Sequence, residues 1–229
     1  MAGNDLNNAA TDNDSQTWAT RVHWNPIESS TATLHLGAWA FHEEIAAGAS
    51  GVVRSSAIAG HFNDLVKITP GALLGAERST AYGAELAGFF GPAWATGEWG
   101  TRNLRGADAS GRYDLDHQAW AVSAGWFLAG ATPAYSGKAG TWGKVKVADP
   151  VTRGGSGAWE LKGRYEDVDY AELPSGGTGH AWTLGANWYL NDFSRVMFEA
   201  VRWQTRHRSG SAAGRDEGTT FNTRLQLVF

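Results

Sequence analysis

The chain ends on the segment Thr219-Thr220-Phe221-Asn222-Thr223-Arg224-Leu225-Gln226-Leu227-Val228-Phe229. The apolar residues at odd positions are Phe221, Leu225, Leu227 and Phe229, whereas Thr220, Asn222, Arg224 and Gln226 occupy even ones. A period of two is that of a β-strand with one apolar and one polar face. A carboxyl-terminal aromatic residue is unusual at the end of a water-soluble strand. The segment therefore predicts a strand whose apolar face lies against a nonpolar environment.

The same alternation recurs along the rest of the chain. The clearest repeats are residues 18–24, 34–40, 82–90, 95–99, 120–128, 159–166, 182–190 and 195–199. Short turns are expected around Asn25, Gly91, Gly130 and Asn191, and longer loops around Ala47, Ala107, Ser175 and Ala212. This pattern predicts ten or eleven antiparallel strands, each of about ten residues, the length at which a tilted strand crosses a bilayer. The expected fold is an all-β, antiparallel transmembrane β-barrel over residues 17–229, after a polar segment at residues 1–16.

The composition agrees with this fold class. The 229 residues include 30 Gly and 12 Trp, only 18% are charged, and the mean hydropathy is -0.33. Indole rings favour boundaries between apolar and aqueous phases, and a water-facing lumen lowers the hydropathy average of a barrel. The uncharged run 118–137 is long enough for a membrane helix, but its Gly and Pro residues favour two strands joined by a turn. A soluble β-sandwich or lipocalin-like barrel is the other alternative, and it requires the tryptophan-rich face to be buried.

Several classes of chemistry have weak or no signals. Cysteine is absent, and a net charge of -4 argues against a nucleic-acid partner. His42-Glu43-Glu44 lacks the second His of a zinc-protease helix, and His23 with His35 lacks a third ligand. An outer-membrane lipid hydrolase is an alternative without a Ser-centred motif to support it. We expect neither an enzyme nor a cofactor.

If the apolar set faces lipid, the alternate set lines a lumen and determines ion preference. The basic members of that set are Arg21, Lys162, Arg164, Arg195 and Arg224. The acidic members are Glu85, Glu98, Glu160, Glu166 and Glu199. Five of each sign do not make an anion-attracting surface. For Lys162 and Arg164, pairing with nearby glutamates is favoured over contact with a solute.

A set of segments resembles the phosphate-selective porins O and P, sixteen-stranded trimeric channels of the Gram-negative outer membrane. The segments are residues 34–38, 82–92, 125–128, 157–165 and 183–191, together with Phe229. The resemblance implies a cell outer-membrane porin for passive diffusion of small hydrophilic solutes, including anions such as phosphate. It also implies contact with outer-membrane lipid and assembly as a homotrimer.

The resemblance adds candidate anion-binding residues. Arg54 stands where the family has an Arg-rich segment, and it joins the five basic residues of the inward set. A basic hairpin is a further candidate, although a solvated loop explains it equally well. Its charges are Lys138, Lys144, Lys146 and Arg153.

Family members are longer than this chain, so the likeness covers the carboxyl-terminal half of such a barrel or slightly more. A sheet with two free edges is unstable in lipid. The sheet therefore closes as a smaller barrel, pairs with another chain or is incomplete. The alternative function is a non-conducting partial barrel, or a structural outer-membrane protein that needs a partner chain. Residues 1–16 show no signal-peptide pattern, which predicts a mature form, a recombinant form or a piece of a longer protein.

Overall fold

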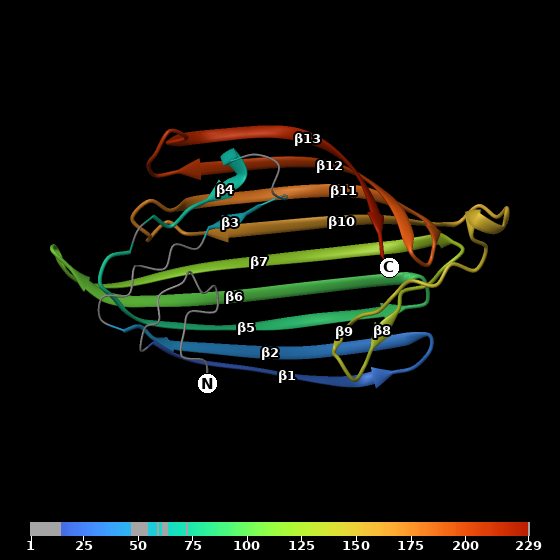
Figure 1. The fold of residues 1–229 in the computed structure, drawn as a ribbon, viewed down its shortest axis with the longest axis horizontal. Helices are drawn as coiled ribbons and strands as arrows, with labels where there is room; N and C mark the ends of the chain where they lie inside the picture. The colour runs from blue at the N-terminus through green and yellow to red at the C-terminus, as the bar shows by residue number, and fades with distance from the viewer. Residues whose placement is uncertain (1–14, 47–54, 59, 61–63, 72, 229) are drawn as a thin grey trace.

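The computed structural model describes residues 15–46, 55–58, 60, 64–71 and 73–228. Within these ranges the chain is mostly β-strand, which confirms the predicted all-β class, and nine long strands form one sheet (Figure 1). Their bounds are β1 (Gln16–Glu28), β2 (Ala32–Glu44), β5 (Ala76–Phe90), β6 (Ala93–Asp108), β7 (Gly111–Ala129), β10 (Ala158–Asp169), β11 (Gly177–Asn191), β12 (Ser194–His207) and β13 (Gly214–Leu227).

The sheet is an antiparallel meander in which each strand pairs with the next long strand in the chain. Its order is β1-β2-β5-β6-β7-β10-β11-β12-β13. β1 and β13 form the two opposite edges, and the described strands include no pairing between them (Figure 1). Ten or eleven long strands were expected, and the described residues form nine, besides two short two-stranded pairs. The difference arises because residues 130–157, which lack regular alternation, do not supply the strand expected after Gly130.

The two faces of the sheet differ as the alternation predicts. One face, called the outer face below, exposes apolar side chains such as Leu184, 69% exposed, and Phe221, 80% exposed. Indole rings of Trp18, Trp24 and Trp182 also lie exposed on it. A soluble sandwich or lipocalin-like barrel would bury this set, so that alternative is wrong.

Two connections cover the opposite face, called the inner face. The segment after β2 contains β3 (Ser56–Ala57), η1 (Asp64–Val66) and β4 (Lys67–Ile68). Its Ile58, Val66 and Ile68 are fully buried against inner-face side chains of the last strands, including Val201 and Trp203. This packing removes from water an apolar patch that would otherwise line the interior.

The second connection, residues 130–157, contains β8 (Tyr135–Ser136), β9 (Thr141–Trp142) and η2 (Val151–Arg153). Phe127, Val147, Ala158 and Tyr189 form the buried cluster at its base. From there it crosses to the inner face of β1 and β2 (Figure 1). The two segments therefore narrow the inner side from opposite walls.

Connection lengths depart from the expected asymmetry. Residues 29–31, 91–92 and 192–193 form short turns at one end of the sheet, called the turn end, but the connection after Gly130 at that end is long. At the other end, called the loop end, β6 and β7 are joined by only two residues around the expected loop at Ala107. The Ser110 amide donates to the Asp108 carboxylate at 2.8 Å, and Gly111 has a φ of 128°, so a tight turn forms there.

Two local features correct the sequence reading. Asn25-Pro26 is a register shift inside the β1–β2 pair rather than the expected turn, because an edge strand tolerates Pro at a bulge. The run 118–129 belongs to strand β7, so the helix alternative for this run is wrong. In the described ranges no helix has the length and apolarity to cross a membrane.

Candidate pore-lining face

The inner face carries the charged residues that the alternation assigned to it, and most of them form pairs. Arg21 Nε on β1 lies 2.6 Å from Glu85 Oε1 on β5. Lys162 Nζ lies 2.7 Å from Glu199 Oε1. Arg164 Nη2 lies 2.9 Å from Glu166. Lys162 thus pairs with a glutamate of another strand, as expected, whereas Arg164 pairs with a glutamate of its own strand and not across strands. These ion pairs neutralise three of the five basic residues assigned to the inner face, so less positive charge is available to attract an anion.

A buried carboxylate organises the turn end of the inner face. Glu160 is only 4% exposed and accepts hydrogen bonds from Trp94 Nε1 at 2.6 Å, Asn187 Nδ2 at 2.5 Å and the Tyr189 hydroxyl at 2.9 Å. Arg195 Nη1 donates to the same Tyr189 hydroxyl at 3.0 Å. The network joins β6, β10, β11 and β12. Its hydrogen bonds fix the positions of Glu160 and Arg195 on the inner face.

The remaining candidates for anion contact are Arg224, Arg54 and the basic hairpin. Arg224 is exposed on the inner side of β13, and its side chain makes no hydrogen bond or ion pair within the described part of the chain. Arg54 lies outside the described residues. In the basic hairpin, Lys144 Nζ lies 3.3 Å from the ring centre of Phe193, and Lys146 contacts Asp192 at 3.3 Å. These lysines contact the turn after β11, which supports the solvated-loop explanation.

Polar contacts hold the β8–β9 hairpin against the inner face. The Tyr135 hydroxyl donates to Asn25 Oδ1 at 2.9 Å, and His35 Nδ1 lies 2.5 Å from that hydroxyl. Partial burial raises the pKa of Tyr135, so the phenol keeps its proton over a wide pH range. On β2, His35 is 2% exposed, which places it beneath the hairpin.

Two more contacts fasten the hairpin to β1. The Nε2 atom of His23 lies 3.0 Å from the Gly137 carbonyl oxygen, so this nitrogen carries the proton that is donated. Arg21 donates from Nη2 to the Gly140 carbonyl at 3.0 Å. His23 and His35 stack at 5.5 Å between ring centres, as their adjacent positions predicted. No group of three or more His, Cys, Asp or Glu suited to a metal occurs in the described ranges.

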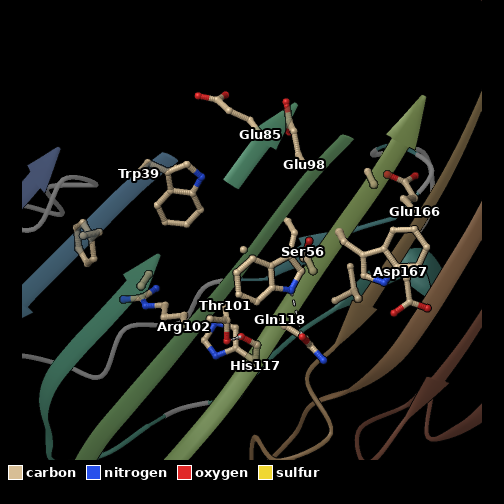
Figure 2. Close-up of a pocket in the computed structure, with 18 of the residues that line it drawn as sticks. Trp39, Ser56, Glu85, Glu98, Thr101, Arg102, His117, Gln118, Glu166 and Asp167 are labelled. Carbon is tan, nitrogen blue, oxygen red and sulfur yellow. Dashed lines mark hydrogen bonds between the residues drawn. The ribbon is translucent and has the colours of Figure 1, made fainter. Parts of the chain in front are cut away.

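A groove of about 750 Å³ lies between the two covered walls (Figure 2). Glu85, Glu98 and Glu166 line it from β5, β6 and β10, and Arg102 and His117 line its loop end. Glu85 and Glu98 are direct register partners. The Glu98 side chain makes no hydrogen bond or ion pair inside the described ranges. This groove is richer in acidic than in basic groups.

Arg102 is an inner-face residue that the sequence reasoning missed. It donates from Nε to Ser79 Oγ at 2.6 Å, lies 3.7 Å from Glu43 and stands over the Phe41 ring. The alternation contained the signal, because Arg102 is four residues after Glu98 and therefore shares its face.

Comparisons with known proteins agree with this geometry. The family model described as phosphate-selective porin O and P matches residues 4–229. Porin O of Pseudomonas aeruginosa is 29% identical over 160 residues, which cover 66% of this chain and 35% of that protein. The match thus spans about a third of the curated relative's length. The chain therefore belongs to the phosphate-selective porin O and P family and is an outer-membrane protein.

Proposed function

We propose that the nine-stranded sheet is part of the wall of a channel through which small hydrophilic solutes diffuse passively. The observation that carries this proposal is the separation of the two faces. The outer face exposes rings and aliphatic side chains, whereas the inner face carries ion pairs and a groove of about 750 Å³. A sheet of this kind separates lipid from water. Membership of the family supports a transport role over a catalytic one.

The inward segments support a selective route rather than a wide pore. The β3–β4 segment packs on the last strands, and the β8–β9 hairpin is fastened to the first two. A solute that moves along the inner face passes between them, so both segments influence the size of solute that enters.

Anions, inorganic phosphate among them, are the solutes we propose. Support comes from the family and from six basic residues assigned to anion contact: Arg21, Arg54, Lys162, Arg164, Arg195 and Arg224. Arg224 is the strongest candidate among the described residues, because its guanidinium has the forked donors that match phosphate oxygens and is not committed to a carboxylate. Arg21, Lys162 and Arg164 form ion pairs with glutamates, so a strong preference for anions requires further basic groups beyond the described inner face.

Planar-bilayer recordings test the proposal. The sample is the native protein extracted from the outer membrane, together with any partner that co-purifies with it. We expect discrete conductance steps, an anion-directed reversal potential in a KCl gradient and a reduced chloride current when phosphate is added. Folded, inserted protein without conductance overturns the channel role. Conductance without any phosphate effect overturns only the proposed solute.

A second candidate is a non-conducting, partner-dependent outer-membrane sheet, and the two unpaired edges favour it. The same recordings decide between the two, since only the channel conducts after insertion. We also propose the homotrimer that the family resemblance implies. Cross-linking of detergent-extracted protein tests it, and a monomer at all cross-linker concentrations contradicts it.

A further inference from the structure

Three arginines lie close together on the outer face of β12 and β13, near the loop end. They are Arg202, Arg206 and Arg215, and all three are exposed. Arg206 and Arg215 are direct register partners on the two strands. Like charges directly opposite each other destabilise an antiparallel pair. The patch therefore needs negative charge, either from an acid of the protein or from a ligand.

Glu217 is the carboxylate that the protein places among these arginines. Arg202 Nη2 lies 3.1 Å from Glu217 Oε1, and Arg215 Nη2 lies 3.3 Å from Glu217 Oε2. Arg206 makes no hydrogen bond or ion pair within the described part of the chain. The outer-face carboxylates of β10, at positions 167 and 169, are two strands away from β12, or about 10 Å, where salt screens much of their charge. Three arginines and one glutamate leave two positive charges uncompensated.

A second pair of facing arginines shows how the protein neutralises such a pair elsewhere. Arg78 on β5 and Arg105 on β6 are also register partners. Arg78 Nη2 lies 2.9 Å from Glu44 Oε1, and Arg105 Nε lies 3.1 Å from Asp114 Oδ2. Each of these arginines therefore has its own carboxylate, whereas Arg206 has none among the described residues. The missing counter-charge on β12 and β13 points to a bound anion.

The position of the patch indicates that the anion belongs to a lipid. Arg202 is the register partner of Trp182, an exposed indole of β11 of the kind that marks a membrane boundary. Arg206 lies four residues further toward the loop end, about 13 Å along the strand. Toward the turn end, the same face exposes Leu184 and Phe221. A lipid headgroup on the arginines places its acyl chains on these apolar side chains, whereas a free anion gains contacts with an open surface only.

We propose that Arg202, Arg206 and Arg215 bind the phosphomonoester headgroup of a membrane lipid in the leaflet at the loop end. A phosphomonoester carries about -1.5 to -2 charges at neutral pH, which matches the two uncompensated positive charges. A phosphodiester carries a single negative charge and leaves one of them unmatched. Guanidinium forks donate paired hydrogen bonds to phosphate oxygens, which suits arginine to this role. The proposal rests on the outer-membrane location of the protein and not on conductance.

Native mass spectrometry tests the proposal on the full-length protein, extracted from the outer membrane, stripped of lipid and held in dodecyl maltoside. Dioleoyl phosphatidic acid is a phosphomonoester, and dioleoyl phosphatidylglycerol is a phosphodiester with the same chains. We expect phosphatidic acid to bind roughly ten-fold more tightly. Equal affinities overturn the proposal, and this comparison needs no variant. Glycerol 3-phosphate is the same monoester without acyl chains, and its displacement of bound phosphatidic acid at equal concentration would assign the site to a free anion and overturn the lipid.

Variants locate the site. Arg206→Gln with Arg215→Gln is expected to lower the affinity for phosphatidic acid by roughly ten-fold or more. The matched control, Arg78→Gln with Arg105→Gln, should keep the affinity of the unmodified protein. Glu217→Gln frees both arginines that this glutamate pairs, so it should raise the affinity several-fold, and a fall would contradict the proposal. Equal losses in the two double variants overturn it. So does an altered oligomeric state with unchanged lipid affinity, because a second copy then covers the patch.

Discussion

Glu160 is a buried acid whose charge is satisfied by three neutral donors from two other strands, β6 and β11. Glu160→Ala leaves the Trp94, Asn187 and Tyr189 donors buried without an acceptor. Each such loss costs about 1–3 kcal/mol, so we expect the free energy of unfolding to fall by about 3 kcal/mol or more. Urea unfolding of vesicle-inserted protein, followed by tryptophan fluorescence, measures this change.

Glu98→Ala is the matched control, since this glutamate lies on the same face and is exposed. Its stability is expected to stay within about 0.5 kcal/mol of the wild type. Equal losses for the two variants would contradict the structural role of the Glu160 network.

Glu98 is expected to influence ion preference instead. Its side chain lies opposite Glu85 with no hydrogen bond or ion pair inside the described ranges. Removing one charge about 7 Å from an ion in water changes its energy by about 0.6 kcal/mol, or roughly two- to three-fold in permeability ratio. Glu98→Gln is therefore predicted to shift the reversal potential toward anions, and Glu98→Asp to leave it unchanged. A shift toward cations for Glu98→Gln would refute this account.

At the scale of elements, the β8–β9 hairpin depends on a few polar contacts. Tyr135→Phe removes the hydroxyl that contacts Asn25 and His35, which weakens the attachment by about 1–2 kcal/mol. We expect single-channel conductance to rise and to fluctuate more. Tyr113→Phe is the control, because that hydroxyl bonds to Leu74 at the loop end. An unchanged conductance for Tyr135→Phe would show that the hairpin does not narrow the route.

The base of the same connection carries a pH-dependent contact. The Asp192 carboxylate accepts hydrogen bonds from the Val147 amide at 2.8 Å and from Lys146 Nζ at 3.3 Å. These bonds, and the Val147 bond most of all, lower the pKa of Asp192 below its ordinary value of 3.8. The pKa of Asp192 is therefore lower in the folded protein than in the unfolded chain. The contact stabilises the folded protein fully at pH values above the pKa of the unfolded chain, and this stabilisation is lost as the pH falls through the pKa of the folded protein. The Val147 amide resonance should therefore titrate below pH 3.8. Asp192→Asn should abolish that titration, and its persistence would contradict the assignment.

The sequence predicted the strands better than the connections. The period of two assigns residues 159–166 of β10 to alternate faces, as the structure has them, because pleating leaves only two directions. It did not predict that residues 130–157 fold back over β1 and β2. That placement depends on contacts between residues more than a hundred positions apart, such as Tyr135 with Asn25, which no local pattern encodes. Arg102 was missed although its position on the inner face followed from the same period.

At the scale of the whole molecule, aromatic rings on the outer face mark two levels. Trp182 packs on Tyr165 at 4.5 Å, and Trp188 stacks on Trp159 at 5.4 Å, both across β10 and β11. Six residues separate the two levels on each strand, or about 20 Å along it. Such levels are expected where a bilayer meets water on both sides. Brominated lipids should quench Trp182 strongly and the inner-face Trp203 weakly, and the reverse order would contradict the assigned faces.

The channel proposal requires that the tryptophan-bearing face touches lipid while the charged face touches water. Single-cysteine variants along β10, probed in outer membranes with a charged, water-soluble thiol reagent, test it most directly. We expect labelling at Lys162→Cys, Arg164→Cys and Glu166→Cys, and protection at Leu161→Cys and Gly163→Cys. Uniform labelling, or labelling confined to positions 161 and 163, would contradict it.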